Sequence, residues 1–252
     1  MGKIGQIGPQ LRRTGWETSR VSGRPIIGFA HRGMRDQAPD NSLAGYRLAL
    51  AAGARALEGD VWPSADGVAV LDHDGTGGAG LRRRPLPQLS RDQLGGLDSL
   101  DDLYRECGAD FELSLDIKHP GALAPVLRAA AEAGATARLW LCHPDWRLVA
   151  TWRESAGPAR LVDSTRLKKM TEGPAGRVKD LAEAGIDALN LPYPDWSPEL
   201  VGLCRNAGVK VLAWHAHTRP LLEDMVALGV DGVFSDDVVA MIDVLTAAGR
   251  LA

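Results

Sequence analysis

From Pro25 onward, short apolar runs rich in β-forming residues alternate with longer segments that carry alanine and leucine at helical spacing. A repeated strand–helix unit produces this rhythm, and its strands pair in parallel. The pattern predicts strands at Ile26–Ala30, Ala56–Trp62, Glu112–Ile117, Ala137–Cys142, Ala159–Asp163, Ala188–Leu191, Lys210–Trp214 and Gly232–Ser235. It predicts helices at Ser42–Ala52, Leu100–Cys107, Ala122–Ala133, Trp146–Glu154, Val178–Ala184, Pro198–Ala207, Pro220–Leu228 and Val238–Ala247. Eight units of this kind close a barrel, so we predict an α/β protein with a (β/α)8 TIM barrel over residues 25–252.

One segment, Pro63–Ser99, departs from the rhythm. It holds a hairpin arm at Val68–Leu71, a glycine-rich turn from Gly75 to Gly80 and a basic run from Arg82 to Arg84. This is too long for a simple strand-to-helix loop. We therefore predict a small insertion after the second strand, in a place where long loops often carry function.

Composition adds limits to this picture. The 252 residues are 45% hydrophobic and 24% charged, as in an ordinary globular protein, and no linker divides them. A net charge of −3 gives no general attraction to nucleic acid or an anionic membrane, and no apolar run reaches transmembrane length. The three cysteines are widely spaced and read as reduced thiols, so we expect a cytoplasmic protein. Residues 1–24 lack a secretory pattern and are predicted to form an N-terminal arm or a segment that closes one end of the barrel.

Carboxylates cluster at the predicted strand ends, which is where barrel enzymes hold their active sites. The second strand ends in Glu58-Gly59-Asp60, and alternation along a strand points both acids into the barrel. The third strand adds Asp116 and, two residues later, Lys118. Converging carboxylates repel one another unless a cation lies between them. We therefore predict one divalent ion on Glu58, Asp60 and Asp116; oxygen ligands suit Mg²⁺ and Ca²⁺, and Mn²⁺ also fits.

The first strand ends in His31-Arg32-Gly33, and the insertion contributes Asp72-His73-Asp74. A metal on the three acids would neutralise a phosphate oxygen, while Arg32 and Lys118 supply further positive charge. Two imidazoles can divide the proton transfers near neutral pH. These residue types together predict cleavage of a small-molecule phosphodiester, with His31 and His73 facing each other beside the metal.

Several strings of the sequence resemble the glycerophosphodiester phosphodiesterase family. They are HRG, P-D-N-S, G-A-x-x-L-E-x-D-V, D-G-V-x-V-L-x-H-D, L-x-L-D-I-K, G-V-K-V-L-A-W and G-V-D-G-V-F-S-D, spread over residues 26–237. The resemblance implies that His31 and His73 are the acid and base pair, that Glu58, Asp60 and Asp116 bind the metal, and that Arg32 and Lys118 contact the phosphate. It also implies attack by a substrate hydroxyl, a cyclic phosphate opened by water, and release of glycerol 3-phosphate and an alcohol.

The chain departs from the family pattern at two acids. Asp116 stands where glutamate is usual, and Asp40 replaces the glutamate of P-E-N-T. An aspartate as third ligand also occurs in spider-type phospholipases D, so cleavage of lysophospholipids or sphingolipids through a cyclic phosphate is the main alternative. A barrel that only binds is disfavoured, because both histidines and all three acids are retained. A sugar-phosphate lyase is disfavoured too, because His215, His217 and Asp236 stand where it would need a phosphate-binding glycine loop.

Some of these residues also have plainer interpretations. Asp116 and Lys118 would form an inward salt bridge without any metal. We interpret His215 and His217 as structural. Trp62 and Trp214 are candidates for an apolar rim that holds a bulky alcohol or an acyl chain, although ordinary packing explains each equally well. Nothing in the sequence indicates the natural alcohol or the oligomeric state.

Overall fold

The structure, a computed structural model, describes residues 23–78 and 83–252. The predicted arm over residues 1–24 lies outside the described residues except for its last two positions. Part of the glycine-rich turn and of the basic run lies outside them as well. The prediction of an arm therefore stays a prediction.

Eight parallel strands form a closed barrel. They are β1 (Ile27–His31), β2 (Ala56–Pro63), β6 (Glu112–Ile117), β7 (Leu139–His143), β8 (Arg160–Ser164), β9 (Ala188–Pro192), β10 (Lys210–Trp214) and β11 (Gly232–Ser235). Each strand pairs with the next along the chain, and β11 returns to pair with β1. The predicted (β/α)8 barrel is confirmed.

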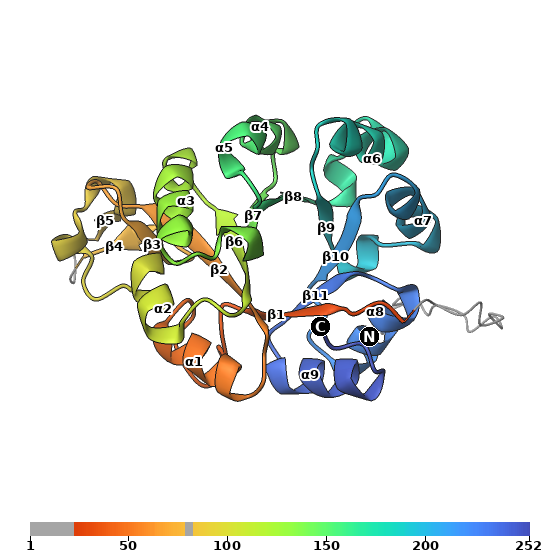
Figure 1. Ribbon diagram of the computed structural model, residues 1–252, viewed down its shortest axis with the longest axis horizontal. Helices are drawn as coiled ribbons and strands as arrows, with labels where there is room; N and C mark the ends of the chain where they lie inside the picture. The colour runs from red at the N-terminus through yellow and green to blue at the C-terminus, as the bar shows by residue number, and fades with distance from the viewer. Residues whose placement is uncertain (1–22, 79–82) are drawn as a thin grey trace, which may run out of the picture.

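Helices surround the barrel on its outside (Figure 1). They are α1 (Leu43–Ala51), α2 (Leu100–Cys107), α3 (Leu123–Glu132), α4 (Trp146–Thr151), α5 (Arg153–Ala156), α6 (Gly173–Glu183), α7 (Pro198–Asn206), α8 (Arg219–Leu228) and α9 (Val238–Ala247). Short 3₁₀ turns join them: η4 (Pro120–Ala122), η5 (Thr136–Arg138), η6 (Leu167–Lys169) and η7 (Tyr193–Asp195). Within residues 23–78 and 83–252, no helix combines the length and the apolar character needed to cross a bilayer.

Two predicted helices differ from the observed ones. The helix expected at Trp146–Glu154 is divided into α4 and α5, and the Thr151 hydroxyl near the division donates a hydrogen bond to the carbonyl of Leu148. Helix α6 begins five residues before the expected Val178, with a proline in its first turn. Proline lacks the N–H that the first turn leaves unused, so it starts this helix rather than preventing it.

The insertion after β2 is a small unit with its own core. Strand β3 (Ala69–Leu71) pairs antiparallel with β2, and β4 (Thr76–Gly77) pairs with β5 (Arg84–Pro85). The 3₁₀ turns η2 (Leu86–Gln88) and η3 (Arg91–Gln93) follow. Apolar side chains bury one another beneath this unit, namely Val70, Leu86, Leu89 and Leu94, with Trp62 packed against them. The insertion is thereby attached to the strand that carries Glu58 and Asp60.

Aromatic side chains fill the barrel below the site. The ring of Phe29 stacks on that of Phe234 at 4.5 Å and meets the edge of Trp140 at 5.8 Å between centroids. Because side chains alternate along a strand, the next inward positions lie one layer higher, at the carboxyl ends. At these carboxyl ends the strand register pairs His31 with Glu58 and Asp60 with Asp116. The apolar layer thus forms a dry floor for polar chemistry.

Candidate active site

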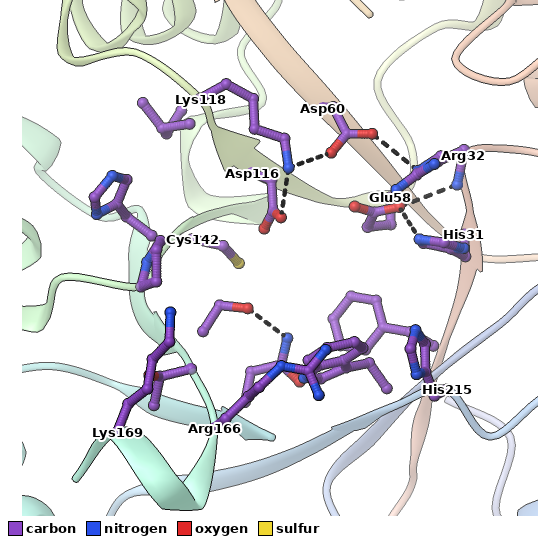
Figure 2. Close-up of a pocket in the computed structure, with 18 residues that line it drawn as sticks. His31, Arg32, Glu58, Asp60, Asp116, Lys118, Cys142, Arg166, Lys169 and His215 are labelled. Atoms are coloured by element: carbon purple, nitrogen blue, oxygen red, sulfur yellow. Dashed lines mark hydrogen bonds and ion pairs between the residues drawn. The ribbon is translucent and has the colours of Figure 1, made fainter. Parts of the chain in front are cut away.

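The carboxyl ends of the strands enclose a cavity of about 420 Å³. Figure 2 shows acidic side chains along one wall and Arg166 and Lys169 along the opposite one. The lining includes most of the site residues expected from the sequence, namely His31, Arg32, Glu58, Asp60, Asp116, Lys118 and Trp214. A volume of this size accommodates a small molecule.

Three carboxylates meet on one wall of the cavity. An oxygen from each of Glu58, Asp60 and Asp116 can be chosen so that all lie within 4.8 Å of one another. Glu58 and Asp60 are almost fully buried, with side chains only 7% and 1% exposed. Oxygen donors that converge from two adjacent strands match the ligand set that a hard divalent ion takes in proteins.

The pKa values of these acids reflect their shared burial. Burial raises the pKa of Glu58 to about 8; the charges of Asp60 and Asp116 act in the same direction, while His31 opposes them. Burial also raises the pKa of Asp116. Asp60 differs, because Lys118 and Arg32 outweigh its burial and lower its pKa. Protein cations therefore outweigh burial at Asp60, whereas burial prevails at Glu58 and Asp116.

The two cations expected to contact phosphate lie among these acids. The Lys118 ammonium is 2.7 Å from Asp60 Oδ1 and 3.2 Å from Asp116 Oδ2. The Arg32 guanidinium is 2.9 Å from Asp60 Oδ2, and its backbone N–H donates to Glu58 at 3.0 Å. Their positive charges therefore lie against the three carboxylates.

A buried network orients Asp60. The amide of Asn41 donates to Asp60 Oδ2 at 3.0 Å and accepts from the Asp60 backbone N–H at 3.0 Å, while Tyr46 donates to the same amide oxygen at 3.0 Å. Gly59 lies beneath, where an added Cβ would collide with the Tyr46 hydroxyl and the Asn41 side chain. Asn41 belongs to the P-D-N-S string, so its position carried a signal that the sequence analysis did not use.

Strained backbone occurs at the same end of the barrel. Among the described residues, the non-glycine residues with positive φ are Arg32, Asn41 and His215, at 55°, 55° and 64°. Arg32 and His215 line the cavity, and Asn41 holds Asp60. Such strain is retained where the surrounding structure imposes it, and it concentrates at functional sites.

His31 is held by an acid that the sequence analysis did not select. Its Nδ1 lies 2.5 Å from Asp236 Oδ1, at the end of β11, and its Nε2 lies 3.8 Å from Glu58. Burial alone would lower the pKa of His31, but Glu58 and Asp236 outweigh it and raise that pKa. Asp236 also forms an ion pair with the Arg35 guanidinium at 3.5 Å, and its backbone N–H donates to His217 Nδ1 at 3.1 Å. His217 thus contacts the support of His31, while His215 lines the cavity itself.

His73 occupies a different place from His31. It is absent from the cavity lining, its side chain is 47% exposed, and its Nδ1 lies 2.9 Å from Asp74. The preceding residue, Asp72, donates its backbone N–H to the carbonyl of Asp60 at 3.1 Å, so His73 is one residue away from a backbone bond to β2, which carries two of the acids. The structure does not show the two imidazoles facing each other in the cavity, and the catalytic role of His73 stays a prediction.

The two tryptophans also separate. Trp214 lines the cavity, and the Arg166 guanidinium lies 4.6 Å above its ring. Trp62 packs instead against the core of the insertion and fills the space beside Gly75. It is not among the residues that line the cavity, and its place in an apolar rim stays a prediction. The physical reason for its position is the antiparallel β3 arm, which gives Trp62 apolar neighbours outside the barrel mouth.

Known proteins resemble this chain over most of its length. The model of the glycerophosphoryl diester phosphodiesterase family matches residues 31–137. A probable glycerophosphodiester phosphodiesterase 2 of Mycobacterium tuberculosis is 28% identical, covering 93% of this chain and 95% of that protein. The chain is thus similar to this family, most directly over residues 31–137. These similarities are to phosphodiester hydrolases, the reaction class that the strings at the strand ends suggested.

Solved structures named for the same activity share the fold. A putative glycerophosphoryl diester phosphodiesterase from Silicibacter pomeroyi superposes with a TM-score of 0.79 at 23% identity, over 90% of this chain and 95% of that one. A phosphodiesterase from Oleispira antarctica, solved with the product sn-glycerol-3-phosphate, superposes with a TM-score of 0.74 at 19% identity, over 88% and 97%. These phosphodiesterases and the present chain thus share one barrel architecture.

Proposed function

We propose that the chain is a divalent-metal-dependent phosphodiesterase that converts glycerophosphodiesters into glycerol 3-phosphate and an alcohol. The observation that carries this proposal is the convergence of Glu58, Asp60 and Asp116 beside His31 in one cavity. The family supports the reaction class, and the Oleispira relative was solved with the corresponding product.

The metal is proposed from the chemistry of its donors. Glu58, Asp60 and Asp116 offer only oxygen atoms, which suit Mg²⁺, Ca²⁺ and Mn²⁺. Two of these acids have raised pKa values, so the charges of the protein only partly offset their burial. A divalent ion would make the carboxylate form favourable and would supply positive charge for a phosphate oxygen. Arg32 and Lys118 extend that positive charge along the wall.

His31 is proposed as one proton-transfer group. Because Asp236 holds Nδ1, the Nε2 atom is the one free to exchange a proton with substrate. A carboxylate on Nδ1 also stabilises the charged imidazole after it has taken a proton. The nearby Arg32 and Lys118 orient the phosphate next to this atom.

His73 is proposed as the second proton-transfer group. One imidazole would take the proton of the attacking substrate hydroxyl, and the other would give a proton to the leaving alkoxide, so that a cyclic phosphate forms and the alcohol leaves. Water then opens the cyclic phosphate to glycerol 3-phosphate. The proposed role of His73 is supported by its closeness in the chain to Asp72, whose backbone N–H bonds to the carbonyl of Asp60. An exposed side chain can change rotamer when substrate enters.

The cavity favours a water-soluble diester over a lipid. Most of the residues that line it are charged or polar, and Trp62 is not among them. Burying an acyl chain against such groups would cost their hydration without compensation. Lysophospholipid cleavage therefore serves as the contrasting arm of the test.

A substrate panel with defined variants tests this proposal. Glycerophosphodiesters and lysophospholipids are assayed with and without chelator, followed by addition of Mg²⁺, Ca²⁺ or Mn²⁺. We expect release of glycerol 3-phosphate that is abolished by chelator and falls by about 10³-fold or more in His31→Ala, as for loss of a proton-transfer group. His119→Ala, an exposed histidine outside the cavity, is the matched control and should keep full activity. Activity that survives both chelator and His31→Ala would overturn the proposal.

His73→Ala separates the second histidine from the first. A loss comparable to that of His31→Ala, with normal metal binding, is expected if His73 transfers a proton. Unchanged kcat in His73→Ala would remove it from the mechanism and leave the metal and His31 assignments standing.

A further inference from the structure

The wall of the cavity opposite the acids carries two cations that the proposed reaction does not use. Arg166 and Lys169 come from η6 and the residue before it, directly after β8, and both line the cavity. Figure 2 shows them across the opening from Asp116 and Asp60. This separation places positive charge away from the proposed position of the phosphodiester.

In the described part of the chain, these two cations have no acidic partner. Arg32 and Lys118 each lie within 3.3 Å of carboxylates. In residues 23–78 and 83–252, by contrast, no ion pair joins Arg166 or Lys169 to an acid within 4.0 Å. A pair of cations that lines a cavity without counter-charge attracts an anion from outside the protein.

The Arg166 guanidinium is held in place before any ligand arrives. It lies 4.6 Å above the Trp214 ring. Its segment is fixed by backbone bonds on both sides: Thr165 N–H donates to the carbonyl of Asn190 at 3.0 Å, and Leu167 N–H donates to Asp195 at 2.8 Å. Holding a side chain in its binding position reduces the entropy lost when a ligand binds.

Neutral polar groups beside Arg166 also lack partners. Thr165 and Asn190 line the cavity and are only 4% and 5% exposed, yet Thr165 Oγ1 and Asn190 Oδ1 make no hydrogen bond with the described residues. Buried polar atoms are normally bonded, so orphaned ones in a cavity indicate a missing partner. A hydroxyl can donate to an anion, and an amide oxygen accepts from a hydroxyl or ammonium group.

We propose that Arg166, Lys169 and Thr165 form a subsite for an anionic group, a carboxylate or a phosphate, on the alcohol half of the substrate. This rests on the proposed function, in which the phosphodiester lies on the acidic wall. The glycerol half carries no charge, so only the alcohol half can bring a second anion to the opposite wall. The substrate class is then a glycerophosphodiester with an acidic alcohol.

The same geometry disfavours a cationic alcohol such as choline. A quaternary ammonium is recognised by an open aromatic face, and the face of Trp214 is already covered by Arg166. Lys169 adds like-charge repulsion at the same wall. Arg166 and Lys169 therefore both attract an anionic alcohol group and disfavour a cationic one.

Two diesters that differ by one carboxylate test the subsite. Glycerophosphoserine is glycerophosphoethanolamine with a carboxylate added to the head group. We expect kcat/KM for the serine diester to exceed that for the ethanolamine diester by about tenfold or more, the effect of one charge-assisted hydrogen bond. Arg166→Gln and Lys169→Gln should each reduce this ratio at least about threefold, chiefly through KM. Lys168→Gln, an exposed neighbour that does not line the cavity, should leave the ratio unchanged.

Calorimetric binding of the same two diesters to His31→Ala protein in Mg²⁺ separates this inference from the proposed function. Tighter binding of the serine diester, weakened by Arg166→Gln, supports the subsite even if no diester is hydrolysed. Equal binding and equal kcat/KM for the two diesters overturn the subsite while leaving hydrolysis intact. A ratio that Lys168→Gln reduces as much as Lys169→Gln also overturns it, because the effect would then be general surface charge.

Discussion

Metal binding to the three carboxylates should release a proton, and Glu58 is its main source. Burial raises the pKa of Glu58 to about 8, with Asp60 and Asp116 adding to the effect. Below that pH an incoming divalent ion must displace the proton, because only the carboxylate is a ligand. Each pH unit then changes the apparent affinity about tenfold, or about 1.4 kcal/mol. We expect Mg²⁺ affinity to rise about tenfold between pH 6 and pH 7 and to level off above the pKa of Glu58.

The same pKa makes thermal stability depend on metal and pH together. The pKa of Glu58 in the folded chain lies above its ordinary value of 4.5. Without metal, its contribution to stability is fully present below pH 4.5 and is lost as the pH rises toward about 8. Metal that binds only the folded protein adds stability in proportion to its affinity. The rise in Tm on adding Mg²⁺ should therefore be larger near pH 8 than near pH 6.

Titration calorimetry in two buffers of different ionisation enthalpy measures the released proton directly. We expect close to one proton released per ion near pH 6.5. Glu58→Gln should bind Mg²⁺ weakly and with a much smaller pH dependence, whereas Glu132→Gln, an exposed acid on α3, should behave like the unaltered protein. A flat affinity across this pH range, with no proton released, would refute the reasoning about Glu58.

Three further substitutions test the supports of the site and of the barrel. Asp236→Asn keeps a hydrogen bond to His31 but removes the negative charge. The pKa of His31, measured by NMR or from a pH–rate profile, should therefore fall by about 0.7 unit, or about 1 kcal/mol. An unchanged pKa of His31 would contradict this expectation. Arg177→Ala leaves the fully buried Asp163 without the guanidinium that lies 2.6 Å from it. The free energy of unfolding, measured by denaturant titration, should therefore fall by about 3–5 kcal/mol. A loss below about 1 kcal/mol would show that the ion pair is dispensable. Gly59→Ala inserts a methyl group against Tyr46 and Asn41, which orient Asp60. It should lower the free energy of unfolding by about 1–3 kcal/mol, and with it Tm, and it should also weaken Mg²⁺ binding. Normal Tm and normal Mg²⁺ affinity would refute the proposed crowding.

The acidic wall could be predicted because its geometry is nearly local. Parallel strands place their carboxyl ends at one rim, and alternation along β2 points Glu58 and Asp60 to the same side. The register then pairs Asp60 with Asp116, as the barrel requires. His31 joins them because β1 pairs with β2. Four site residues therefore follow from strand order and periodicity alone.

Contacts between distant segments were beyond such reasoning. Asp236 lies 205 residues from His31 in the chain, and only closure of the barrel brings β11 beside β1. Loop conformation decides the rest: the turn after β3 leaves His73 exposed, and the insertion draws Trp62 away from the mouth. Rotamers in such loops depend on neighbours that no periodic pattern specifies.

The sequence by itself therefore determined the barrel, the insertion and the identity of the converging acids, because repeated apolar periods and strand ends are short-range properties. Only the tertiary structure decided which partner holds each side chain. It placed Asp236 behind His31, and it set Arg166 on Trp214 across the cavity from the acids. Those arrangements depend on packing between loops of different strand–helix units, and that packing exists only once the barrel has closed.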